Sequence, residues 1–137
     1  MTTLLNAIRE QLIDELGVYK GLTSRLIHHY MPERKLHLFD TFEGFLEEEK
    51  FHKKKHFVYK NLDEVKKNIK NLKLKKTSVY KCKFPSYVSK VFNNRKYKLC
   101  HLDVNTYKST KKSFEFVKDR LVKGGVVVFD DYGIYTT

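Results

Sequence analysis

The apolar run near the end of the chain, residues 125–130 (Gly-Val-Val-Val-Phe-Asp), constrains the fold more than any other feature. A strand with one face in water alternates apolar and polar side chains, whereas a strand covered on both faces is apolar at successive positions. Strands of the second kind occur in parallel sheets that carry helices on either side. The run therefore predicts an α/β protein with a mainly parallel sheet.

The rest of the chain agrees, because short apolar segments alternate with segments of helical periodicity, which is the pattern of β–α–β units. We predict strands over residues 12–18, 35–40, 77–82, 97–104 and 125–130. We predict helices over residues 23–31 and 62–72, after Ser86, and around Phe114, Val117 and Leu121. This order indicates a doubly wound, Rossmann-like sheet of about five strands with helices on both faces. Residues 1–137 are taken as a single domain.

Basic residues exceed acidic ones by 28 to 16, which gives a net charge of +12. The excess concentrates between Lys50 and Lys76, where 11 lysines accompany two acidic residues. Such a block is either a solvated basic surface or a contact for an anionic partner such as nucleic acid. The block has no RNA-binding signature in which aromatics and glycines are interleaved, and lysine outnumbers arginine, so the solvated surface is favoured. A basic nucleic-acid-binding module on a degenerate enzyme fold remains the alternative.

Several other classes of protein and site are disfavoured. No apolar run approaches the ~20 residues that span a bilayer, and the N-terminus has no signal-peptide pattern, so we expect a cytoplasmic protein without a membrane partner. Cys82 and Cys100 lack a C-x-x-C partner and are interpreted as buried, reduced thiols. His52 and His56 could share a helix face, but the lysines between them would repel a metal ion.

Carboxylates lie at the ends of four of the predicted strands: Glu15, Asp40, Asp103, and the pair Asp130 and Asp131. The carboxyl ends of parallel strands meet at one edge of the sheet, and ligands of doubly wound folds bind there. We therefore expect the functional site at this edge.

The first part of this site is the motif Glu15-x-Gly17-x-x-x-Gly21, with Asp40 placed 25 positions after Glu15. Glycines permit a tight turn and the close approach of a ligand, and a carboxylate near this spacing is typical of a group that holds ribose hydroxyls. Tyr19 occupies the place of the middle glycine in the dinucleotide motif, which disfavours a pyrophosphate. A ligand with ribose and adenine but no phosphate, such as S-adenosylmethionine, fits better.

The second part of the site consists of Asp103, Asp130 and Asp131. Neighbouring strands lie about 4.8 Å apart, so these carboxylates could share one cation. Oxygen ligands of this kind suit Mg²⁺. The alternative is that they cap neighbouring loops.

Four segments resemble the macrocin O-methyltransferase family. They are Glu15-Leu-Gly-Val-Tyr-Lys-Gly21, Phe39-Asp-Thr-Phe-Glu-Gly44, His101-Leu-Asp-Val-Asn-Thr-Tyr107 and Gly124-Gly-Val-Val-Val-Phe-Asp-Asp-Tyr-Gly133. The resemblance runs from residue 12 to residue 133, with the motifs in the family's order. It implies a class I enzyme that uses S-adenosylmethionine to methylate a hydroxyl of a sugar or another small molecule.

The resemblance also implies roles for single residues. Asp40 would hold the ribose, with Thr41 and Phe42 near the adenosine. Asp103, Asp130 and Asp131 would bind the magnesium ion, and Asp103 would also be the catalytic candidate that assists deprotonation of the acceptor. The methionine part of the cofactor would be lined by Glu15, Gly17, Val18, Tyr19, Lys20, Gly21 and Thr23.

Three departures from the family are visible. Leu22 replaces a second glycine, and Asn105 stands where the family usually has an aspartate. Family members also continue beyond Asp-Asp-Tyr-Gly into a helix and further strands. We therefore expect a sheet that lacks the last strands of the family, a low or absent activity of this short chain, and an open edge at the fifth strand that could pair with a second copy.

Overall fold

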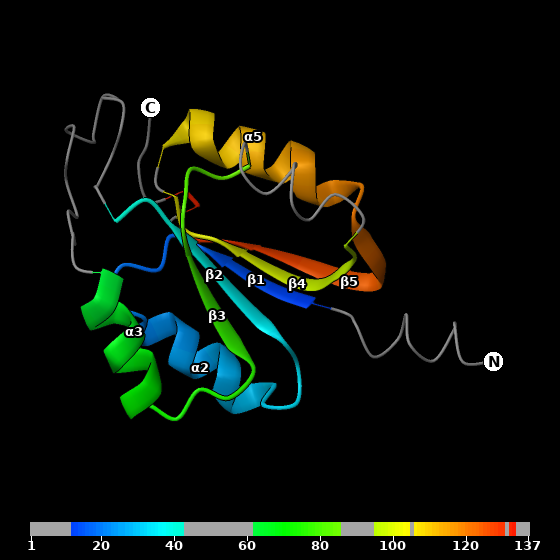
Figure 1. Cartoon of the computed structure of the whole chain (residues 1–137). Coiled ribbons are helices and arrows are strands. Elements are labelled where there is room, and N and C mark those ends of the chain that lie inside the picture. The colour runs from blue at the N-terminus through cyan, green and yellow to red at the C-terminus, as the bar shows by residue number, and fades with distance from the viewer. Residues whose placement is uncertain (1–11, 43–61, 86–94, 105, 131, 134–137) are drawn as a thin grey trace.

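The computed structural model describes residues 12–42, 62–85, 95–104, 106–130 and 132–133 (Figure 1). The strands are β1 (Leu12–Leu16), β2 (Leu36–Asp40), β3 (Thr77–Lys81), β4 (Tyr97–Leu102) and β5 (Leu121–Phe129). The helices are α2 (Leu22–Tyr30), α3 (Leu62–Asn71) and α5 (Tyr107–Lys118). The helix expected after Ser86 falls outside the described residues.

The strands form one sheet in the order β3-β2-β1-β4-β5, and all four neighbouring pairs are parallel. Helix α5 covers one face of the sheet, and α2 and α3 lie on the other (Figure 1). The prediction of a doubly wound α/β fold is confirmed. Among the described segments, no helix has both the length and the apolar character needed to cross a membrane.

Two apolar clusters fill the space between the sheet and its helices, and we name the two faces of the sheet after them. On the α5 face, Leu16, Phe39 and Leu102 pack beneath Phe116 and Val117 of the helix. On the α2 face, the cluster joins strands β1 and β2 to both helices, through Ile13, Leu36, Leu38, Ile27, Val65 and Ile69. Side chains of a strand point alternately to its two faces, so both clusters draw on the same strands.

The apolar stripe expected around Phe114 is wrong in detail. Phe114 is 38% exposed, and the buried positions of α5 are Ser113, Phe116 and Val117. An α-helix repeats every 3.6 residues, so a shift of one position, from 114 to 113 and from 117 to 116, turns a different side of the helix inward. Ser113 fits this inward face because it is small.

Leu121, expected in the same helix, instead begins β5. The Arg120 backbone N–H donates to the Val117 carbonyl at 2.8 Å and closes the last turn of α5. The Tyr97 N–H donates to the Arg120 carbonyl at 2.8 Å, so sheet pairing starts at once. Tyr97 then pairs with Leu121 but Leu99 with Val126, and the extra residues of β5 form a bulge.

Strand β5 lies at the edge of the described sheet and is less covered than its apolar sequence predicted. Val126, Val128 and Phe129 are 51%, 42% and 37% exposed. Within β5, Leu121 and Val127 pack against the cluster of the α5 face. The expectation of burial on both faces is therefore wrong for this strand within the described residues.

The cysteines agree with their interpretation as free thiols. Cys100 is buried in the α5-face cluster, and Cys82 is half-buried beside it. Burial raises the pKa of the Cys82 thiol to about 11, so this sulfur stays protonated near neutral pH.

Candidate functional site

The loop after β1 passes over the carboxyl edge of the sheet and is pressed against the end of β4. Gly17 has φ +86°, and a Cβ built on it would lie 1.7 Å from the carbonyl oxygen of Asp103. The Asp103 N–H donates to the Leu16 carbonyl at 2.8 Å on the same side. Only glycine can occupy position 17, because any side chain would overlap the backbone of β4.

Asp40 fastens the other side of this loop to the end of β2. One carboxylate oxygen, Oδ2, accepts the backbone N–H groups of Val18 and Tyr19, each at 2.8 Å. The other oxygen, Oδ1, accepts the N–H of Phe42 at 2.8 Å. A carboxylate has about four acceptor positions. The side chain predicted to hold a ribose is therefore also the clamp of the loop, and about one acceptor position is left for a ligand.

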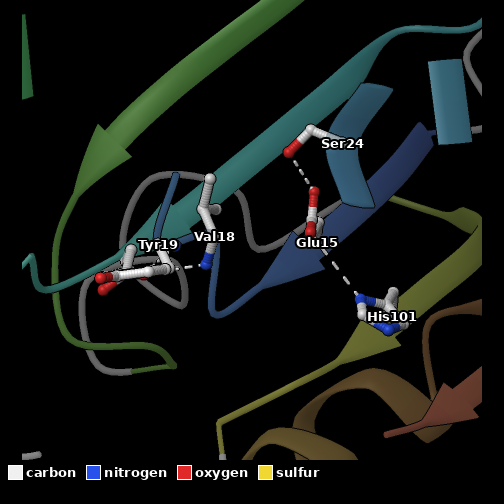
Figure 2. A network of polar contacts seen from close by, with 6 residues as sticks. Glu15, Val18, Tyr19, Ser24 and His101 are labelled. Carbon is white, nitrogen blue, oxygen red and sulfur yellow. Dashed lines mark hydrogen bonds and ion pairs between the residues drawn. The ribbon is translucent and has the colours of Figure 1, made fainter. Parts of the chain in front are cut away.

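Glu15 lies beneath the loop on the α2 face and is fully buried, at 0% exposure. The Ser24 hydroxyl, in the first turns of α2, donates to its Oε2 (Figure 2). On the other side His101, its register partner on β4, places Nδ1 3.9 Å from Oε1. Three elements thus hold one carboxyl group at the edge where the ligand is expected.

The electrostatics of this edge are unusual for a basic chain. Burial raises the pKa of Glu15 to about 8; the hydrogen bond from Ser24 opposes the shift, and the nearby charges of Asp103 and Asp40 add to it. Burial also lowers the pKa of His101, against the attraction of Asp130. Near neutral pH the site thus holds a largely protonated Glu15 and a neutral imidazole.

The other residues expected around a cofactor lie either in the loop and at the start of α2 or directly after β2. Lys20 is exposed, with Nζ 5.3 Å from the centre of the Tyr19 ring, and Thr23 is half-buried at the start of α2. Gly21, with φ +84°, is the N-cap of that helix. By contrast Phe42 is 1% exposed and packs into the α2-face core, in the same apolar cluster as Val18 of the loop. Thr41 beside it is half-buried.

The carboxylates expected to bind a metal are brought together in part. The Asp130 N–H donates to the Leu102 carbonyl at 3.0 Å, which places Asp130 beside Asp103 on the neighbouring strand. Within the described residues no group of three or more His, Cys, Asp and Glu side chains could hold a metal ion. Asp131 lies outside those residues, so the predicted triad stays a prediction.

Sequence reasoning missed Ser24, His101 and a second buried carboxylate, Asp14. His101 precedes Asp103 by two positions, and this spacing in a strand could have placed both side chains on one face. Asp14 is 0% exposed on the α5 face, and neither of its oxygens has a hydrogen-bond partner of normal geometry in the described part of the chain. Burial raises its pKa well above the usual range, with the Tyr97 hydroxyl and the Arg95 charge acting against burial.

Known structures share this fold over nearly the whole chain. The crystal structure of CalS11, a calicheamicin methyltransferase, superposes with a TM-score of 0.69 and 20% identity. The apo structure of CalS11, described as a TDP-rhamnose 3′-O-methyltransferase of calicheamicin biosynthesis, gives 0.64 and 19%. Each match covers 96% of this chain and 62% of that one, so this chain spans less than two thirds of their length.

An rRNA methylase from Streptococcus thermophilus also matches, with a TM-score of 0.57 and 14% identity over 96% of this chain and 70% of that one. At such identities these likenesses show the fold alone. A comparison with curated protein sequences finds no match.

The family described as macrocin-O-methyltransferase (TylF) matches residues 2–137. That range contains the glycine loop, the clamp at Asp40 and the carboxylates at the ends of β4 and β5. The chain therefore belongs to the macrocin O-methyltransferase family.

Proposed function

We propose that this chain binds S-adenosylmethionine at the loop after β1 and serves the transfer of its methyl group to a hydroxyl of a sugar or another small molecule. The observation that carries the proposal is the convergence of Glu15, Asp40 and Asp103 around the loop at residues 17–19. Membership of an O-methyltransferase family supports the reaction. A sugar acceptor is supported by CalS11, which is described as acting on TDP-rhamnose.

The residues present fit such a cofactor. Gly17 has no side chain, and Tyr19 and Gly21 also have positive φ values. The loop can therefore turn tightly over the end of the sheet, where a ligand can approach its backbone closely. Asp40 retains acceptor capacity for a ribose hydroxyl. Glu15 and Asp103 supply negative charge beside a positively charged sulfonium and ammonium. The cofactor, when bound, supplies an electrophilic methyl group.

The role of Asp103 in this proposal is to take the proton of the acceptor hydroxyl. It lies half-buried at the end of β4, and its backbone touches the loop at Gly17. A base contributes to catalysis only when it reaches the proton in the bound complex, and this edge is where the acceptor would meet the methyl group.

Magnesium is a separate part of the proposal. Asp103, Asp130 and Asp131 would hold it through carboxylate oxygens, and a bound magnesium ion would lower the pKa of the acceptor hydroxyl. If so, Mg²⁺ raises the melting temperature of the chain and leaves that of the Asp130→Asn/Asp131→Asn variant unchanged, because a ligand that binds the folded state stabilises it. An equal rise in both proteins would place the ion elsewhere.

The experiment that tests the cofactor proposal uses two ligands and calorimetry. S-adenosylhomocysteine should bind the wild type, and its 2′,3′-dideoxyribose analogue should bind about 10- to 100-fold more weakly, the value of hydrogen bonds to a charged group. In Asp40→Ala the two ligands should bind with nearly equal affinity. The comparison of ligands within one protein separates the ribose contact from the loop clamp. Equal discrimination in both proteins would remove Asp40 from the ribose site.

The same preparation tests the basic-module alternative. If the lysine-rich segment were a nucleic-acid site, binding would fall steeply between about 50 and 200 mM salt. We expect only weak binding without sequence preference. Selective binding at physiological salt, together with no binding of S-adenosylhomocysteine, would replace the enzyme proposal by the alternative.

A further inference from the structure

Two buried polar atoms face each other at the candidate site, but they are too far apart to form a hydrogen bond with each other. Glu15 Oε1 and His101 Nδ1 are 3.9 Å apart, and neither has a hydrogen-bond partner in the described part of the chain. The residues are 0% and 8% exposed. A hydrogen bond of this kind needs about 2.7–3.2 Å. Buried polar atoms are nearly always paired, so this gap calls for a missing partner.

Two contacts of the fold set the positions of these side chains. Ser24 of α2 donates to Oε2 of Glu15 and so directs Oε1 toward β4 (Figure 2). The register of β1 with β4 sets His101 directly opposite Glu15. The facing positions of Glu15 and His101 are therefore set by the pairing of the two strands, and the Glu15 carboxyl is held by Ser24.

The chemistry of the gap selects its occupant. Without a cation beside it, Glu15 is largely protonated near neutral pH. A neighbouring cation favours the ionised form, whose oxygen accepts hydrogen bonds, as does the bare nitrogen of a neutral imidazole, so an occupant that serves both atoms must donate at least two hydrogens. The charges nearest to Glu15 are those of Asp40 and Asp103, both negative. In a chain of net charge +12 this is a locally negative place, which favours a cation. A primary ammonium group meets both requirements.

We propose that His101 is a positioning residue of the cofactor site, which together with Glu15 receives the ammonium group of the cofactor's methionine part. This inference rests on the proposed function, and it adds a residue that the sequence motifs did not assign. Glu15 supplies the charge, Ser24 holds the carboxyl from behind, and His101 accepts a second ammonium hydrogen. The ammonium group then gives both buried atoms a hydrogen-bond partner.

The test compares S-adenosylhomocysteine with its desamino analogue, in which hydrogen replaces the amino group. The wild type should prefer the first ligand by about 10- to 100-fold. In His101→Leu we expect binding of S-adenosylhomocysteine to weaken about tenfold and binding of the analogue to change by less than about twofold. A merely structural role would weaken both ligands alike.

Three further variants keep the result interpretable. His37→Leu removes an equally buried imidazole from the α5 face and should leave the preference between the ligands unchanged. Ser24→Ala acts on the same carboxyl from the other side and should lower the preference, as should His101→Phe, which keeps a ring but has no acceptor, if the leucine variant is poorly folded. An unchanged preference in all three site variants, or an equal loss for both ligands, would overturn the inference. Failure of the wild type to bind either ligand would overturn the proposed function itself.

Discussion

Asp14 and Glu15 are consecutive residues of β1, both fully buried and both carboxylates, yet they meet opposite environments. Glu15 points to the α2 face, where a hydroxyl donates to it and an imidazole faces it. Asp14 points to the α5 face, where no hydrogen-bond partner of normal geometry reaches its oxygens in the described part of the chain. The strand turns successive side chains to opposite faces, so one step in sequence separates a built polar site from an uncompensated buried group.

The strand register places Glu15 and Asp14 in two adjacent rows of paired residues that cross the sheet. Glu15 lies in a row with Leu38, His101 and Val128, whereas Asp14 lies in a row with His37, Cys100 and Val127. The first row is one residue nearer the carboxyl edge, where the loop and the other carboxylates gather. A buried carboxylate there can be compensated by a ligand. A buried carboxylate in the second row has only the protein around it, and lowers stability.

The largest expected effect separates the two carboxylates by ligand binding. Glu15→Gln keeps the shape of the side chain and removes its charge, so binding of S-adenosylhomocysteine should weaken by about 1.5–3 kcal/mol. Asp14→Asn, the matched change on the other face, should leave the affinity nearly unchanged, because the side chain of Asp14 points away from the edge where the ligand is expected. Calorimetric titration of both variants decides this. A stronger effect of Asp14→Asn would show that the faces have been assigned the wrong roles.

The next effect separates them by stability. Asp14→Val replaces an uncompensated carboxylate with an apolar side chain that suits a strand, and should raise the free energy of unfolding by about 1–3 kcal/mol. Glu15→Val, which leaves the Ser24 hydroxyl and His101 without their partner, should give a smaller gain or a loss. Urea unfolding of the two variants measures the difference. A destabilised Asp14→Val would mean that Asp14 has a partner.

A third test uses pH. The folded pKa of Glu15 is raised from 4.5 to about 8, so the folded chain holds a proton that the unfolded chain has lost, and stability falls as pH rises through this range. His37, lowered from 6.5 to about 4, acts in the opposite sense but only below about 6.5. Between pH 6.5 and 8 the free energy of unfolding should therefore fall by about 1–2 kcal/mol. Asp14, whose pKa is also raised by burial, acts in the same sense, so Glu15→Gln should reduce this slope without removing it. A stability that rises over the same range would contradict the assignment.

The smallest expected effect concerns strand β5, and it compares side chains on the two faces of this strand. Val128 is 42% exposed on the α2 face, while Val127 packs under α5. We propose that the open edge of β5 pairs with a second copy of the chain, because exposed strand edges template pairing. Val126→Thr/Val128→Thr should lower self-association in light scattering with little change in stability. Val127→Thr should instead lower stability by about 1 kcal/mol. Self-association unaffected by the double variant would exclude this edge.

Much of this architecture could be predicted from the sequence, because it depends on local patterns. Apolar runs and helical periodicity predicted the parallel sheet, and the strand ends predicted the edge at which Glu15, Asp40 and Asp103 meet. The errors arose where tertiary contacts decide. Phe114 was assigned to the buried face of α5 and Leu121 to the helix, although only the pairing of Tyr97 with Leu121 determines where β5 begins.

The sequence indicated which carboxylates belong to the candidate site, but it did not indicate which atoms they contact. No local signal shows that Asp40 accepts three backbone N–H groups, because these come from residues 18, 19 and 42. The opposition of Glu15 and His101 depends on the register of two strands that are about 85 residues apart in the chain. Register is set by the packing of both faces, and a single sequence carries that information only weakly.

The contact between Gly17 and the backbone of Asp103 has a consequence for how this chain can vary. In a library that samples every amino acid at each site-edge position, position 17 should return glycine alone, because a methyl group would sit 1.7 Å from a carbonyl oxygen. Position 21 should be more permissive, because the atoms nearest to its added carbon are 3.8 and 3.9 Å away and only its φ of +84° disfavours other residues. Asparagine is the substitute that such a backbone accepts most readily. Two glycines of one motif are thus fixed to different degrees, the first by a neighbouring strand and the second by its own backbone.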